Sequence, residues 1–133
     1  MTLKIRRLLA VYIDFITAVV VSTVVTNIVT LGNFNAPRSF FMQILSIVIY
    51  LLLVISYIVI KDILFKSASL GKKILGIKII DDNGSDVLKR KILIKRNLEN
   101  LIVFPLYIID VLLNNQSKGD KKYKTKVINI NKS

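Results

Sequence analysis

The apolar residues of this chain gather in two long blocks near its amino terminus. The first block runs from residue 8 to residue 31 and carries one charge, Asp14, whereas the second runs from about residue 40 to residue 60 and carries none. A bilayer's hydrocarbon core is about 30 Å thick, and a helix needs about 20 residues to cross it. Inside lipid, a single segment satisfies its own backbone hydrogen bonds only as a helix. The pattern therefore predicts two transmembrane helices, at residues 8–31 and 40–60.

A short polar segment, residues 32–39, separates the two blocks. Gly32 and Pro37 favour an end to the first helix, and Ser39 is suited to cap the second. Because so short a loop returns the chain directly, we expect the two helices to form an antiparallel hairpin. A cleaved signal peptide is the alternative interpretation of the first block, but its apolar region would be shorter and would rarely contain an aspartate.

Basic residues set the expected orientation. Three of them precede the first block, the loop has only Arg38, and residues 61–96 contain ten Lys or Arg. Cytoplasmic loops carry the excess of Lys and Arg in membrane proteins. We therefore expect a multi-pass protein of the cell membrane with its amino terminus in the cytoplasm and a basic cytoplasmic segment at residues 61–97.

A third apolar stretch, residues 98–113, contains Pro105 and has an uncharged core of only residues 101–109. This core is too short for a straight span. The following tail, residues 114–133, holds six lysines that would lie outside the cell if the stretch crossed the membrane. We interpret the stretch as a bent, re-entrant or interfacial helix followed by a cytoplasmic tail. A third full span is the alternative.

Two short segments have the alternating pattern of strands. They are residues 77–81, which are rich in isoleucine, and residues 125–130 in the tail. A lone strand is unstable in water, so the two are expected to pair. The predicted fold is thus an all-α membrane protein, built on the hairpin with a short third apolar helix and a small cytoplasmic β pairing. We expect it to form one domain over residues 1–133.

The basic residues between these elements are expected to contact anionic lipid headgroups. Residues 86–97 resemble a basic amphipathic helix capped by Ser85, and the residues around Gly71 and Gly76 resemble a turn of interfacial helix. The expected headgroup contacts are Lys72, Lys73, Lys89, Arg90 and Lys91. The glycine pair is not a phosphate loop, because Ile77 follows Gly76 where that motif needs lysine and then Ser or Thr. Nucleic-acid binding is disfavoured, since no recognition motif accompanies the charges.

Asp14 is the most unusual residue of the first block. Small or polar residues mark a helix face that packs on protein. At 3.6 residues per turn Asp14 shares such a face with Arg7, Ala10, Thr17, Ala18 and Val21. A lone carboxylate inside a membrane costs at least about 2.5 kcal/mol. Asp14 is therefore either an ion-binding or proton-relay residue, or a structural carboxylate that holds the basic segment. We weigh the structural role about twice as heavily.

The composition excludes several kinds of chemistry. The 133-residue chain has no cysteine and no histidine, which removes disulfides, thiolate or imidazole metal sites, and Ser-His or Cys-His nucleophiles. We expect no catalytic residues, no metal and no cofactor. The excess of 20 Lys+Arg over 8 Asp+Glu fits a membrane surface.

Four motifs, taken in order, resemble those of the RDD family of bacterial integral membrane proteins. They are residues 7–14, residues 70–78, Arg96 with Asn97, and Gly119-Asp120 followed by Thr125. The resemblance implies a polar site of Arg7, Asp14 and Asp120. It implies packing or motif roles for Ala10, Gly71, Gly76, Arg96 and Thr125. The family's molecular role is largely undefined, and transport of unidentified ligands has been suspected.

Two functions remain open on the residues alone. One is a transporter, or a transport component, for ions or small solutes that uses Asp14. Because two or three helices form too thin a wall for a permeation path, it would need a homo-oligomer or a partner membrane subunit. The other is a non-transporting membrane anchor or accessory subunit of a larger complex. The family resemblance tips this balance slightly toward transport.

Overall fold

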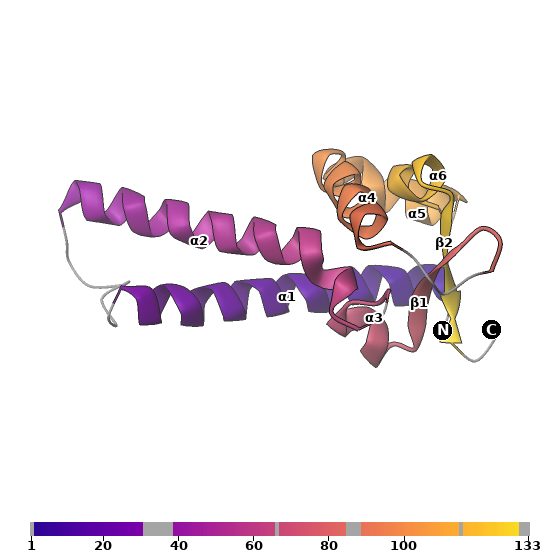
Figure 1. The fold of residues 1–133 in the computed structure, drawn as a ribbon, viewed down its shortest axis with the longest axis horizontal. Helices are drawn as coiled ribbons and strands as arrows, with labels where there is room; N and C mark the ends of the chain where they lie inside the picture. The colour runs from indigo at the N-terminus through magenta and orange to yellow at the C-terminus, as the bar shows by residue number, and fades with distance from the viewer. Residues whose placement is uncertain (1, 31–38, 66, 85–88, 115, 131–133) are drawn as a thin grey trace.

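Two long helices stand side by side and project from a small head formed by the rest of the chain (Figure 1). The computed structural model describes residues 2–30, 39–65, 67–84, 89–114 and 116–130. The loop expected at residues 32–38 and the cap expected at Ser85 lie outside these ranges. Both ends of the described chain lie in the head, at the end away from the turn of the hairpin (Figure 1).

The hairpin consists of α1, Leu3–Val29, and α2, Phe40–Ile60. Both helices are long and apolar enough to cross a membrane. The side chain of Ser39 accepts the Met42 N–H at 3.4 Å, so it caps α2 as predicted. The helix α1 begins five residues before the apolar block, because Thr2 caps it by accepting the Ile5 N–H and the basic residues of its first turns find partners in the head.

The protein-facing side of α1 is narrow and made of small or polar residues. Its buried members recur every three or four positions, and they are Arg7, Ala10, Asp14, Ala18, Ser22 and Thr26. The predicted face is thus correct at Arg7, Ala10, Asp14 and Ala18. It is wrong at Thr17, which is only half-buried, and at Val21, which is 44% exposed. Four-residue steps from Asp14 lead to Ala18 and Ser22, which let the α2 backbone approach closely.

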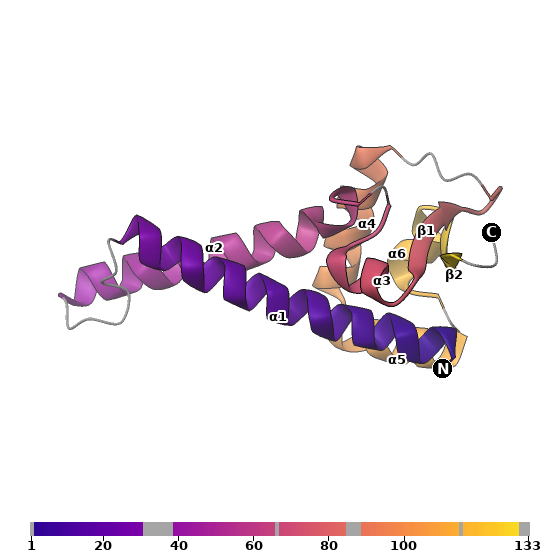
Figure 2. The ribbon, with the colours of Figure 1, turned by 90° about the horizontal axis from the view of Figure 1, so that it is seen from below.

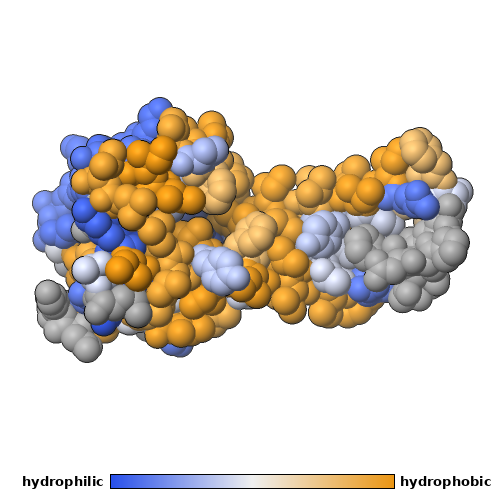
Figure 3. Space-filling view, turned by 180° about the vertical axis from the view of Figure 1, so that it is seen from behind, coloured by the Kyte–Doolittle hydropathy of each residue, from blue (hydrophilic) through white to orange (hydrophobic). Residues whose placement is uncertain are grey.

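Apolar side chains cover the outside of the hairpin. In α2 the only buried residue is Ser46, while residues such as Phe40 and Leu52 are exposed. Figure 3 shows this apolar surface running along the hairpin and onto the adjoining side of the head, with hydrophilic residues gathered at the head's outer end. Two helices that bury so little of their apolar surface suit a lipid environment.

The predicted strand pairing is confirmed. Strand β1, Ile77–Asp81, runs antiparallel to β2, Thr125–Asn129, with Ile79 opposite Val127. Between α2 and β1 lie a 3-10 helix, η1, Lys61–Ile63, and the short helix α3, Leu70–Ile74. The inner faces of the strands pack with Ala10 of α1 and Leu93 to form the small core of the head.

The third apolar stretch does not form one helix. Its first residues belong to α4, Arg90–Ile102, and the rest form α5, Phe104–Asn114, bent from α4 by 103°. Pro105 has no N–H to donate to the carbonyl of Leu101, so the α4 ladder cannot continue through it. The bend expected in this stretch is therefore present, but the predicted helix boundary at residue 98 is wrong, since α4 already begins at Arg90. A bend of this size has the shape of a re-entrant turn or of a broken span. The described residues contain two candidate spans, and a third only if α4 and α5 together count as one.

These helices return the chain to the start of α1. Helix α5 lies along the amino-terminal half of α1 (Figure 2), and α4 packs on α2. Helix α4 begins at Arg90 rather than near residue 86, with Lys89 in an extended conformation before it. The last helix, α6, Lys118–Lys122, packs on α4 and leads into β2.

Helix α3 rests closely on the backbone of α1. A Cβ added at Gly71 would lie 2.3 Å from the carbonyl oxygen of Ala10, so only glycine lets α3 rest on α1. We predict that Gly71→Ala lowers the free energy of unfolding by about 1–3 kcal/mol or more, because backbone must move to admit the methyl group. Thermal unfolding in a mild detergent, followed by circular dichroism, measures the change. Ile74→Ala, at an exposed position of the same helix, is the control and should have little effect.

Candidate functional site

Five charged side chains of alternating sign form a continuous buried chain in the head, which we call the charge network: Arg7, Asp120, Arg96, Asp62 and Lys72. Arg7 Nη2 lies 2.6 Å from Asp120 Oδ2, and Arg96 Nε lies 2.6 Å from Asp120 Oδ1. Arg96 Nη1 then reaches Asp62 Oδ2 at 3.3 Å, and Lys72 Nζ pairs with Asp62 Oδ1. The network thereby joins α1, η1, α3, α4 and α6.

Asp120 is the most constrained member of the charge network. It is the third residue of a capping box, in which its N–H donates to the Ser117 hydroxyl at 3.2 Å and its Oδ2 accepts the Ser117 N–H at 3.1 Å. Thr125 Oγ1 donates to Oδ1 at 3.3 Å. Burial alone would raise the pKa of Asp120, but the charges of Arg96 and Arg7 and the Ser117 N–H together hold that pKa well below its usual range.

Lys72 does not occupy the position that the sequence suggested. It is only 4% exposed and pairs with Asp62, so it does not lie at the surface as expected, and its contact with a lipid headgroup remains a prediction. A buried ammonium needs a carboxylate partner, and Asp62 supplies it. Burial, with the nearby charges of Arg96 and Lys61, lowers the pKa of Lys72 to about 8, although Asp62 opposes the shift. The side chains of Lys73, Lys89, Arg90 and Lys91 are exposed, and their headgroup contacts remain a prediction.

Asp14 belongs to a separate cluster beside the charge network. Its Oδ1 accepts the backbone N–H of Gly71 at 2.8 Å, and its Oδ2 accepts the Ser69 hydroxyl at 2.5 Å and Lys61 Nζ at 3.1 Å. All three donors come from the segment that follows α2. Both carboxylate oxygens therefore hold this segment against α1, which is the arrangement expected of the structural role. Arg7, seven residues earlier on the same face, pairs with Asp120 instead.

The residues expected from the motifs to pack together do so in two places. In the first, Gly71 packs against the backbone of Ala10. In the second, Gly119 lies so close to α4 that an added Cβ would be 2.8 Å from the Arg96 carbonyl oxygen. Gly76 has a different role, since its φ of +66° forms the turn from α3 into β1, a conformation that a β-carbon disfavours.

Sequence reasoning missed Asp62, which lies at the centre of the charge network. Its position could have indicated a role, because Asp62 is a carboxylate two residues after the second hydrophobic block and lies inside a strongly basic segment. No spacing rule, however, relates Asp62 to Arg96, which lies 34 residues further along the chain.

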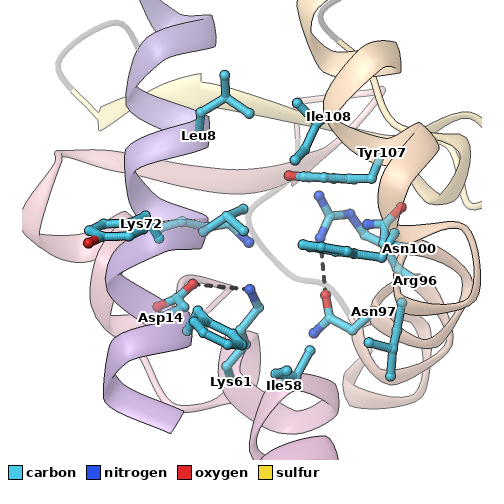
Figure 4. Close-up of a pocket in the computed structure, with 15 residues that line it drawn as sticks. Leu8, Asp14, Ile58, Lys61, Lys72, Arg96, Asn97, Asn100, Tyr107 and Ile108 are labelled. Carbon is cyan, nitrogen blue, oxygen red and sulfur yellow. Dashed lines mark hydrogen bonds and ion pairs between the residues drawn. The ribbon is translucent and has the colours of Figure 1, made fainter. Parts of the chain in front are cut away.

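A cavity of about 600 Å³ opens between α1, the end of α2, α4 and α5. Its polar side chains are Asp14, Lys61, Lys72, Arg96, Asn97, Asn100 and Tyr107. In Figure 4, Lys61, Lys72 and Arg96 approach the cavity from different elements, with Leu8 and Ile108 on its apolar walls. Within the described ranges, no group of three or more acidic, histidine or cysteine side chains could hold a metal ion.

One of three comparisons with known proteins found a match, and it identifies the family. The RDD family model matches residues 4–126, which include every member of the charge network and Asp14, so the resemblance seen in the sequence is confirmed. Searches among curated proteins and among solved structures found no match.

We predict that Asp120→Asn lowers the free energy of unfolding by about 3–5 kcal/mol, because it removes the negative charge that two buried guanidinium groups share. Thermal or denaturant unfolding in detergent measures the loss. Asp82→Asn, in the exposed turn after β1, removes the same charge without a buried partner and should have little effect. Equal losses in the two variants would contradict the assignment of Asp120 as a structural centre.

The pH dependence provides a second test of the same residue. Because the pKa of Asp120 lies below the ordinary aspartate value of 3.8, its stabilisation is complete above that pH and is lost as the pH falls through the lowered pKa. The difference in stability between wild type and Asp120→Asn should therefore shrink below about pH 4. A difference that stays constant to strongly acid pH would contradict this.

Proposed function

Because the chain belongs to the RDD family, we propose that it is a small integral membrane protein that acts as a non-transporting anchor or accessory subunit of a larger membrane complex. The observation that carries the proposal is the coordination of Asp14. Three donors on its two oxygens hold the segment after α2 against α1. A carboxylate that binds an ion or relays a proton must give up such donors in each cycle, and doing so here would release α3 from α1.

The hairpin supports placement in a membrane. Its two helices carry exposed apolar side chains along their length, including Ile28, Phe40 and Leu52. Exposure of this extent in water favours aggregation, whereas lipid covers it without cost. The cell membrane of a bacterium is the proposed location.

The orientation follows from the head. Lys4, Arg90 and Lys91 lie at or near the surface of the head, and Arg6 Nη1 contacts Asn129 Oδ1 at 3.4 Å, which ties the end of β2 to the start of α1. Both described ends of the chain therefore lie in the head, and its basic residues favour placing the head on the cytoplasmic side. There the exposed cations would contact the anionic leaflet, while the apolar faces of the hairpin would pack on a partner membrane subunit or on a second copy.

Ion or solute transport is the second candidate function, and one observation favours it. Asp14 and Lys61 border the cavity, so their ion pair is open to a ligand that enters it. A hairpin of this size would still need further subunits to complete a permeation path.

Flux through vesicles separates the two candidates. We expect vesicles containing the purified, folded protein to show no more proton or cation flux than protein-free vesicles, because Asp14 is held by structural donors. Asp14→Asn should lower the thermal midpoint without changing the flux, and Asp110→Asn in α5 is the matched carboxylate control. A different result would establish transport instead. The wild type would show flux, a folded Asp14→Asn variant would show none, and Asp110→Asn would keep the flux of the wild type.

Cysteine labelling tests the topology, since the native chain has no cysteine. Lys121→Cys in the head and Phe40→Cys at the start of α2 are both exposed positions. We expect a membrane-impermeant maleimide added to intact cells to label only Phe40→Cys, because the hairpin separates the two positions across the membrane. Lysed cells, in which both should be labelled, provide the control. Labelling of Lys121→Cys from outside would overturn the orientation.

A further inference from the structure

The cavity between α1 and α5 has more positive than negative charge around it. Lys61, Lys72 and Arg96 border it, while Asp14 is the one carboxylate among its lining residues. Counting the charge network and the Asp14–Lys61 pair together, four cations share three carboxylates. Six of these seven residues are at most 4% exposed, and Lys61 is 8% exposed, so bulk water does little to screen the charges.

The excess charge is expensive without an anion. Burying a cation costs free energy unless a partner compensates it, and three cations border this cavity beside the one carboxylate of its lining. The low pKa of Lys72, about 8, has the same origin, because burial and the charges of Arg96 and Lys61 outweigh the attraction of Asp62. An anion in the cavity would contact these cations directly.

The rest of the cavity is apolar. Its walls come from α1, the end of α2, α4 and α5, and include Leu8, Val11, Ile58, Leu101 and Ile108. A small inorganic anion would leave most of this surface uncovered, since about 600 Å³ is within the range of sites that bind drug-sized ligands. The shape and chemistry together match a ligand with one anionic end and an apolar body.

The rim of the cavity faces the apolar surface of the molecule. Tyr12 and Phe15 of α1 are 62% and 52% exposed, and Phe104 at the start of α5 is 46% exposed. These aromatic side chains lie where the hairpin meets the head, which is the level at which aromatic belts lie in membrane proteins. A ligand dissolved in the bilayer can therefore enter sideways between α1 and α5.

We propose that this cavity is a binding site for a single anionic phospholipid, with its phosphate held by Lys61, Lys72 and Arg96 and an acyl chain against the apolar walls. The site differs from a general attraction of surface lysines to headgroups, because the cations lie inside the fold and the chain-binding wall is built by four helices. The proposal goes beyond the accessory function and requires only that the hairpin lie in a membrane. Lipid binding and flux are separate measurements, so either proposal can fail alone.

Native mass spectrometry of the purified full chain in a non-ionic detergent tests the site. The probes are dioleoylphosphatidylglycerol, which is anionic, dioleoylphosphatidylcholine, which is zwitterionic, and inorganic phosphate. We expect one phosphatidylglycerol per protomer, with an apparent Kd about tenfold or more below that of phosphatidylcholine, because only the former brings a net negative charge to the buried cations. We expect inorganic phosphate to bind much more weakly than either lipid.

Two pairs of variants locate the binding. Ile108→Trp fills the cavity from α5 and should weaken phosphatidylglycerol binding about tenfold or more, whereas Leu113→Trp, 72% exposed on the same helix, should leave it unchanged. Leu101→Glu and Leu101→Gln differ by one charge on the cavity wall, and the Glu variant should lose more of the preference for the anionic lipid. The second pair decides the question if Ile108→Trp does not fold.

Three results would overturn the proposal. Equal affinity for the two lipids would remove the role of the buried cations. Retention of phosphatidylglycerol by both Ile108→Trp and Leu101→Glu would place the lipid elsewhere on the protein. Inorganic phosphate that binds as tightly as the lipid would identify the ligand as a soluble anion.

Discussion

The carboxylate of Asp120, held between two guanidinium groups, is the interaction on which the head depends. It joins Arg7 near the start of the chain to Asp120 near its end, 113 residues apart, and brings Arg96 from α4 to the same point. None of these side chains could be buried alone, because an isolated buried charge costs several kcal/mol. The three must be buried together, so closing the head requires the last helix to return to the first.

The same need to bury charges in pairs sets how α1 and α2 are aligned with each other. Between helices in lipid there is no hydrophobic driving force, and small residues such as Ala18, Ser22 and Ser46 allow close approach without fixing one register. The register is fixed at the base instead, where Lys61 directly after α2 pairs with Asp14 of α1. Moving α2 along α1 by one turn would separate this pair and leave two charges unpartnered in a buried place.

Some elements of the fold follow from sequence pattern and others do not. The length of the apolar blocks identifies α1 and α2, and alternation identifies β1 and β2, because each pattern reflects which side of a single element is buried. The partners of Arg7 and Lys72 could not be read in this way. Periodicity shows that a residue faces protein, but the charge it meets lies on another element at a distance in sequence that no local rule fixes. The same holds for α4 and α5, where Pro105 signalled a break but the 103° bend depends on how α5 packs along α1.

The balance of charge in the head bears on function as well as stability. Apolar residues of similar volume often stabilise a buried site as well as an ion pair does. Stability alone therefore does not explain why four cations and three carboxylates are buried in the head. Sites where a chain departs from the most stable arrangement are commonly those where it acts. In this protein the charged departure lies where the two helices enter the head, beside a cavity with apolar walls. The functional chemistry of this chain is therefore more readily sought where the two helices enter the head than along the length of the hairpin.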